Sequence, residues 1–111
     1  MASSILLVNK GVNTLADTAE SIYTSPVTGK GTIINAVTAA NNATSNKSYK
    51  AYIVTADEVA ENPQVPFRII LWGDIDLGTG IDGQVIPPGG SLYVECNAAN
   101  SVYFTVSGIE T

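Results

Sequence analysis

The strongest constraint on the fold is a strict alternation of apolar and polar residues near the end of the chain. In S-L-Y-V-E-C (91–96), the apolar residues Leu92, Val94 and Cys96 occupy every second position. In S-V-Y-F-T-V-S-G (101–108), the alternation continues with a second set of apolar residues. Successive side chains of a β-strand point to opposite faces, so this pattern predicts half-buried strands. Cys96 is then expected to be a small core residue and not a nucleophile.

Clusters of Pro, Gly and Asn interrupt the chain at short intervals, as in P-V-T-G-K-G, N-N-A-T-S-N, P-P-G-G and N-A-A-N. Such clusters are typical of turns. Regularly spaced short strands predict an all-β fold. We expect a single antiparallel β-sandwich, Ig-like or jelly-roll-like, of about seven to eight strands. The expected strands are 20–25, 31–40, 47–55, 67–77, 80–86, 91–96 and 101–109. Short helical turns are alternatives to strand or loop only at residues 14–21 and 57–61.

The first nineteen residues differ from the rest of the chain. A strand-like run from Ile5 to Val8 is followed by N-K-G-V-N-T-L-A-D-T-A, which is weakly periodic. Two interpretations stay open: residues 1–19 are an edge strand with a loop, or an arm that becomes ordered against a neighbouring subunit. The sandwich domain is expected to span residues 20–111.

The segment F-R-I-I-L-W (67–72) is apolar on both faces except at Arg68. In a small two-layer sandwich the outer face of a strand should be polar. Either loops cover this strand or one of its faces contacts a protein partner, for which a large aromatic is a typical anchor. The expected partner contacts are Ile5, Leu6, Leu7, Val8, Phe67, Ile70 and Trp72.

Three aspartates and four glycines occur in W-G-D-I-D-L-G-T-G-I-D-G (72–83), a composition that resembles calcium loops. The match to an EF-hand loop fails at its fifth, sixth and twelfth positions. The alternation instead predicts a strand bent at G-T-G, with Asp74, Asp76 and Asp82 pointing to solvent. These carboxylates are weak candidates for a metal site, and neither a metal nor another cofactor is expected.

Composition excludes several kinds of chemistry. The chain has no histidine and one cysteine, so it holds no Ser-His-Asp or Cys-His arrangement and no internal disulfide. Its 111 residues carry a formal net charge of −5. Nucleic-acid binding needs clustered Lys and Arg and is not expected, because the five basic residues are scattered. The prediction is therefore a protein that is not an enzyme and does not bind nucleic acid.

Location follows from the N-terminal sequence M-A-S-S-I-L-L-V-N-K. It has four consecutive apolar residues with no basic residue before them. The apolar run is too short to span a membrane, and a signal peptide would carry basic residues before its apolar run. We expect a protein that is made in a cytoplasm, is not associated with a membrane, and remains there or joins a larger assembly.

Four stretches resemble a pattern common among small virion proteins of tailed bacteriophages. They are Y-T-S-P-V-T-G-K-G-T-I-I-N-A-V-T-A-A-N, A-Y-I-V, V-I-P-P-G-G-S-L-Y-V and S-V-Y-F-T-V-S-G-I-E, within residues 22–110. The resemblance implies a β-sandwich structural subunit of the virion, without catalytic residues. Residues 55–66 and the N-terminal segment fit the pattern poorly.

Three functions follow as hypotheses. The first, implied by the resemblance, is a capsid decoration (cement) protein that binds and stabilises the lattice of the major capsid protein. A homo-oligomer, either a dimer or a trimer, is compatible with this role. The second is another virion position, in the tail, collar or fibre. The third is a small carbohydrate-binding β-sandwich module, for which the candidate aromatics are Tyr49, Tyr52, Trp72, Tyr93 and Tyr103.

Overall fold

Residues 4–111 are described by a computed structural model, and within this range the chain forms strands and turns without any helix. The strands in chain order are β1 (Ile5–Val12), β2 (Glu20–Thr24), β3 (Thr32–Asn41), β4 (Lys47–Val54), β5 (Val65–Ile70), β6 (Ile75–Asp76), β7 (Val85–Ile86), β8 (Ser91–Cys96) and β9 (Val102–Glu110).

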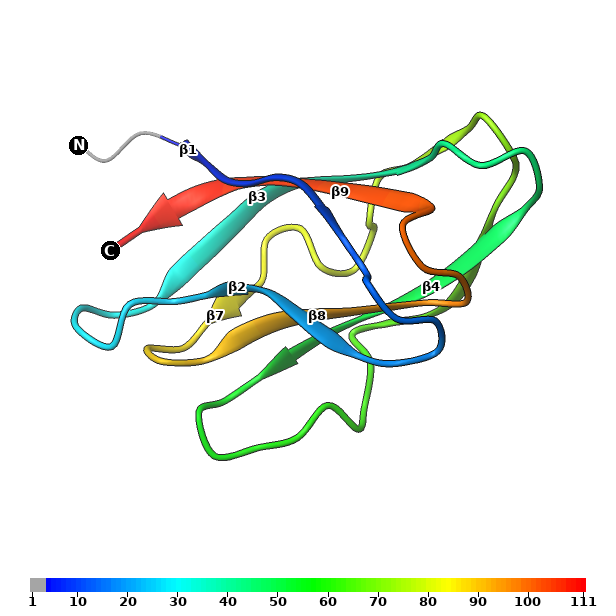
Figure 1. Cartoon of the computed structure of the whole chain (residues 1–111). Helices are drawn as coiled ribbons and strands as arrows, with labels where there is room; N and C mark the ends of the chain where they lie inside the picture. Colours follow the sequence, from blue (N-terminus) through cyan, green and yellow to red (C-terminus); the bar gives the residue numbers. More distant parts are fainter. Residues whose placement is uncertain (1–3) are drawn as a thin grey trace.

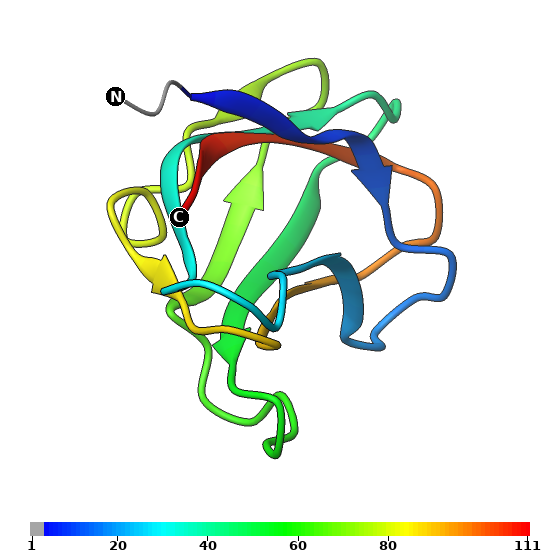
Figure 2. The ribbon, with the colours of Figure 1, turned by 90° about the vertical axis from the view of Figure 1, so that its left-hand side faces the viewer.

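Two antiparallel sheets pack face to face (Figure 1). One sheet has the order β1-β9-β3-β6, with the short β7 also paired to β3; the other has the order β2-β8-β4-β5. Figure 2 looks between the layers, with β1 and β9 in the upper layer and β2 in the lower one. The predicted antiparallel β-sandwich is confirmed.

The core lies where the inward-facing positions of both sheets meet. In β8 the buried residues are Leu92, Val94 and Cys96, each about 1% exposed, as the alternation predicts. In β9 the same parity buries Phe104, whose ring meets the ring of Tyr49 edge to face at a centroid distance of 5.4 Å. Edge-to-face packing suits the charge distribution of aromatic rings, so this pair joins the two layers.

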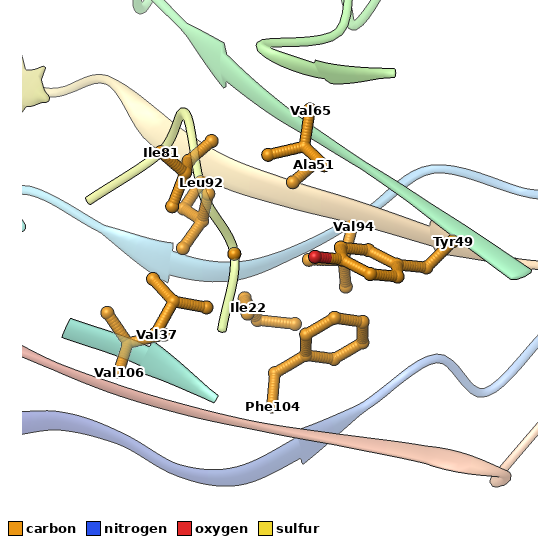
Figure 3. Close-up of a pocket in the computed structure, with 11 residues that line it drawn as sticks. Ile22, Val37, Tyr49, Ala51, Val65, Ile81, Leu92, Val94, Phe104 and Val106 are labelled. Atoms are coloured by element: carbon orange, nitrogen blue, oxygen red, sulfur yellow. The ribbon is translucent and has the colours of Figure 1, made fainter. Parts of the chain in front are cut away.

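A small void remains inside this core (Figure 3). Its volume is about 10 Å³, and its lining exposes no polar surface. A space of this size is near the minimum for one water molecule, and an apolar void of that size offers a water no partners. The void is therefore a packing imperfection and not a ligand site.

The N-terminal segment lies in the sheet. Residues of β1 pair with β9, and Val8, opposite Val106, is buried in the core. The strand is irregular: its register shifts twice, and Lys10 has a φ of 57°. Bulges of this kind twist an edge strand and discourage pairing with other chains. Of the two interpretations of this segment, residues 5–12 have the geometry of an edge strand, and residues 1–3 lie outside the described residues.

Two predicted strands are wrong. The segment 67–77 does not run through as one strand, because β5 ends at Ile70 and a turn follows in which Gly73 has a φ of 73°. This backbone conformation is open to glycine and costly for other residues. The segment 80–86 is mostly a turn, and only its last two residues pair with β3.

The helical turn that competed at 14–21 is also absent. Here the carboxylate of Glu20 accepts hydrogen bonds from the backbone N–H groups of Thr14 and Leu15 and from the Thr14 hydroxyl. These bonds, with that of the Thr14 hydroxyl as the largest contribution, lower the pKa of Glu20 to about 2. The carboxylate closes a loop before β2, so the backbone groups of this segment are satisfied without a helix.

Candidate functional site

Exposed large apolar side chains gather after the start of β5. Among the residues that the structure describes, twelve large hydrophobic side chains are exposed, and six of them fall within residues 67–77. Exposed apolar side chains at this density make the segment a candidate binding surface. The six are Phe67, Ile69, Leu71, Trp72, Ile75 and Leu77.

The turn from Leu71 to Asp74 is held firmly against the turn between β3 and β4. The N–H of Trp72 donates to Oδ1 of Asn46 at 3.0 Å, and the N–H of Gly73 donates to the carbonyl of Asn41 at 3.1 Å. The N–H of Asn41 in turn donates to the carbonyl of Asp74 at 3.0 Å. The Trp72 side chain, 67% exposed, is therefore displayed from a fixed backbone.

A polar cluster fixes the other end of this surface and ties the two sheets together. The hydroxyl of Tyr49 in β4 donates to Oδ2 of Asp76 in β6 at 2.5 Å. The same oxygen accepts from the N–H of Gly78 at 2.9 Å and lies 3.4 Å from the guanidinium of Arg68 in β5. We call Tyr49, Arg68 and Asp76 the inter-sheet cluster. It is built where the edges β5 and β6 approach each other.

The electrostatics of the inter-sheet cluster follow from this geometry. Burial acts to raise the pKa of the Asp76 carboxyl, but hydrogen bonds from Tyr49 and Gly78 and the charge of Arg68 together lower it below its usual value. Burial, followed by the hydrogen bond to Asp76, raises the pKa of Tyr49 well above its usual value. The cluster is therefore a neutral phenol and an ionised carboxylate at ordinary pH, which suits a structural tie.

The aspartates are arranged differently from the prediction. Asp74 and Asp82 are exposed, as expected, and accept hydrogen bonds only from N–H groups of their own turns. Asp76 points inward, whereas its neighbours Ile75 and Leu77 are exposed, so the predicted parity is wrong at these positions. Over residues 4–111, no three His, Cys, Asp or Glu side chains come together as a set that could hold a metal ion.

The predicted partner contacts separate into two groups. Ile5, Leu6, Phe67 and Trp72 are between 49% and 67% exposed, while Leu7 is partly buried against the core. Two of the expected contacts are wrong, because they point inward into the core: Val8, 7% exposed, and Ile70, 3% exposed.

The outer face of β5 is not covered by loops. Phe67 and Ile69 both point away from the core and are each 61% exposed. A shallow hollow of about 420 Å³ lies beside Phe67 on the outer face of the four-stranded sheet, and a second depression adjoins it at Ile69. Both are lined in part by Ser48, Phe67 and Asn97, so they form one continuous hollow. We call this feature the Phe67 hollow.

The aromatics proposed for sugar binding are mostly unsuited to that role. Tyr49 and Tyr52 are 2% and 4% exposed. Burial, and then the hydrogen bond that its hydroxyl donates to Glu95, raise the pKa of Tyr52 to about 12. Tyr93 and Tyr103 are half-buried on the outer faces of β8 and β9, and Trp72 alone of the five is well exposed.

Two asparagines that the sequence analysis treated as turn residues have larger roles. Asn41, 1% exposed, donates from Nδ2 to the carbonyls of Ile70 and Ser45 and accepts at Oδ1 from Ala43. Asn97 accepts at Oδ1 from the N–H of Ser48 across the sheet. The clusters N-N-A-T-S-N and N-A-A-N signalled turns. The distant hydrogen-bond partners of their asparagines depend on which strands are neighbours.

Comparisons with family models, with curated proteins and with solved structures gave no match for this chain. A search of the described residues for a helix that is long and apolar enough to cross a membrane found none.

Proposed function

We propose that this protein is a non-enzymatic structural subunit of a tailed-phage virion, and that it decorates the capsid by docking on the major capsid protein. The observation that carries the proposal is the apolar segment from Leu71 to Leu77, in which Leu71, Trp72, Ile75 and Leu77 are each more than half exposed. Exposed aromatic and aliphatic anchors are typical of the centres of protein interfaces.

The way this segment is held supports docking. Its turn is hydrogen-bonded to the turn between β3 and β4, and Asp76 fixes its far end to Tyr49 and Arg68. A surface that is ordered before binding loses less conformational freedom on binding, which favours affinity. The exposed Ile5 and Leu6 of β1 provide a second apolar region for contact with a neighbouring capsid subunit.

Co-sedimentation with phage heads assembled without this protein tests the proposal. Bound copies are counted on a quantitative gel. A lattice-sized number, in the hundreds per head, is expected for the wild type. Saturation at about a dozen copies would favour a tail, collar or fibre position, and no binding would overturn the proposal.

Two variants locate the contact. Trp72→Ala should reduce occupancy at limiting protein by about tenfold or more, as for a central interface anchor. Val27→Ala is the matched control, because Val27 is 81% exposed in the turn between β2 and β3. Equal loss of binding in both variants would contradict the assignment of the contact to the Leu71–Leu77 segment.

Deletion of residues 1–12 is a poor test of an arm, because it removes an edge strand and the core residue Val8. Substituting Ile5→Ser and Leu6→Ser together removes the exposed apolar surface and leaves the strand pairing in place. A smaller loss of head binding than for Trp72→Ala is expected. Full occupancy with this double variant would remove β1 from the proposed interface.

A further inference from the structure

The Phe67 hollow is a second surface feature, distinct from the Leu71–Leu77 segment. It lies on the outer face of the four-stranded sheet, where Ser48 of β4 is paired with Ile69 of β5 and Lys50 of β4 is paired with Glu95 of β8. Its volume of about 420 Å³ is within the range of small-molecule sites in proteins. An exposed aromatic ring beside convergent polar groups is the arrangement that ligand sites share.

The polar groups around the hollow are positioned by the backbone. Oδ1 of Asn97 accepts from the N–H of Ser48 at 3.0 Å, and Oδ1 of Asn46 accepts from the N–H of Trp72 at 3.0 Å. Because each amide oxygen is engaged, each Nδ2 group remains a hydrogen-bond donor, and neither has a partner among residues 4–111. The two amides therefore offer hydrogen-bond donors in the part of the hollow that Phe67 also lines.

The charges around the hollow narrow the choice of ligand. Two lysines, Lys47 and Lys50, and two carboxylates, Asp17 and Glu95, contribute to its lining. The formal charges cancel, which does not favour a phosphate or another anion. The carboxylates are not part of any metal-holding group in the described chain, and the four charged side chains in the lining do not suit a lipid tail.

We propose that the Phe67 hollow binds a neutral oligosaccharide. Sugar hydroxyl groups both donate and accept hydrogen bonds, so they match a mixture of amide, ammonium and carboxylate groups. The C–H groups of a pyranose ring carry slight positive charge and pack on the negative face of an aromatic ring, here that of Phe67. The adjoining depression at Ile69 extends the hollow, which suits a chain of two or more sugar units.

This site goes beyond the proposed function and uses different side chains. Sugar binding depends on Phe67, Asn97 and Asn46, whereas docking on the capsid depends on the Trp72 side chain. Trp72 does not line the hollow, but its backbone N–H donates to Asn46, so the two surfaces adjoin. A virion protein with both surfaces would attach to the particle through one and hold a surface polysaccharide in the other.

The test is a glycan microarray carrying bacterial O-chains, peptidoglycan fragments and plant and storage polysaccharides, probed with the fluorescently labelled full chain. We expect the wild type to be retained by at least one class of glycan. For the retained glycan, Phe67→Ala should weaken binding about tenfold. Asn97→Asp keeps the acceptor for Ser48 and removes the donor, and should weaken binding about fivefold. Trp72→Ala should bind the glycan as the wild type does.

Two results would overturn the inference. The first is a microarray result in which no glycan retains the wild type better than it retains Phe67→Ala. The second is a Phe67→Ala protein that keeps its glycan binding but loses its binding to phage heads, which would make the hollow a protein contact. Thermal melting of each variant checks folding, and Lys50→Ala replaces Asn97→Asp if the latter does not fold. A Trp72→Ala protein that still binds phage heads at full occupancy would contradict the docking proposal and leave this one standing.

Discussion

The inter-sheet cluster allows a quantitative prediction, because one carboxylate oxygen holds three groups from different parts of the chain. Tyr49→Phe removes a hydrogen bond to a charged acceptor, which typically contributes 1.5–3 kcal/mol. Asp76 keeps the N–H of Gly78 and is partly accessible to water, so we expect the low end, about 1.5 kcal/mol of lost unfolding free energy.

Asp76→Ala should lower the free energy of unfolding by more than Tyr49→Phe does. It leaves the buried Tyr49 hydroxyl and the Gly78 N–H without their acceptor and removes the ion pair with Arg68. We expect a loss of about 3 kcal/mol, mostly from the unsatisfied hydroxyl, since a partly exposed ion pair adds little. At roughly 4 °C per kcal/mol for a domain of this size, the melting temperature should fall by about 12 °C.

The assay is urea unfolding of the wild type, the two single variants and the double variant. Once Asp76 is replaced, Tyr49→Phe removes the unsatisfied hydroxyl and should recover stability, so the cycle should give a coupling energy of more than about 1.5 kcal/mol in magnitude. Asp74→Ala, in the same segment, is the control and should change stability by less than about 0.5 kcal/mol. Additive single effects, within about 0.5 kcal/mol, would refute the reasoning.

The same cluster predicts an acid dependence of stability. The pKa of Asp76 is lowered in the folded protein, from an ordinary value of 3.8. Its contribution is therefore fully present above about pH 4 and is lost as the pH falls through the folded value. Stability of Asp76→Ala should change less with pH in that window than stability of the wild type.

Other predictions concern the turns, the sheet centre and the thiol. Because the pKa of Glu20 is lowered to about 2, the wild type should lose stability between about pH 4.5 and 2, and Glu20→Gln should flatten this part of the pH profile. Gly108→Ala places a Cβ 2.1 Å from the carbonyl oxygen of Ile33, and chemical unfolding should show a loss of about 3 kcal/mol or more. Gly73→Ala, which meets no atom within 4 Å but has a φ of 73°, should cost only about 1–2 kcal/mol by the same measurement. Burial raises the pKa of the Cys96 thiol, so a thiol reagent such as DTNB should react with it only after unfolding; fast reaction of the native protein would contradict its burial.

Regular strands were the part of the fold that periodicity could predict. The buried sets of β8 and β9 follow the alternation of the sequence residue by residue, because each strand is long and has one face on the core. Where the pattern ran through 67–77, the prediction failed. The turn at Gly73 resets the register, and β6 is only two residues long, so Asp76 points inward and Ile75 outward.

The candidate sites were predictable only in part. The apolar character of 67–72 signalled a surface with a role, and Phe67 and Trp72 are exposed. Ile70 could not be separated from them by sequence, because both faces of the segment are apolar. The Phe67 hollow could not be predicted, since its amides come from the start of β4 and the end of β8.

The sequence by itself determined the class of the fold, the buried faces of β8 and β9 and the absence of histidine chemistry. These are properties of local pattern and composition, which no distant contact alters. The tertiary structure decided which edges meet: it brought Asp76 to Tyr49 and Arg68, Asn41 to Ile70, and Asn97 to Ser48. A single polar side chain can be satisfied by many partners, so its role is fixed only when the order of the strands is fixed.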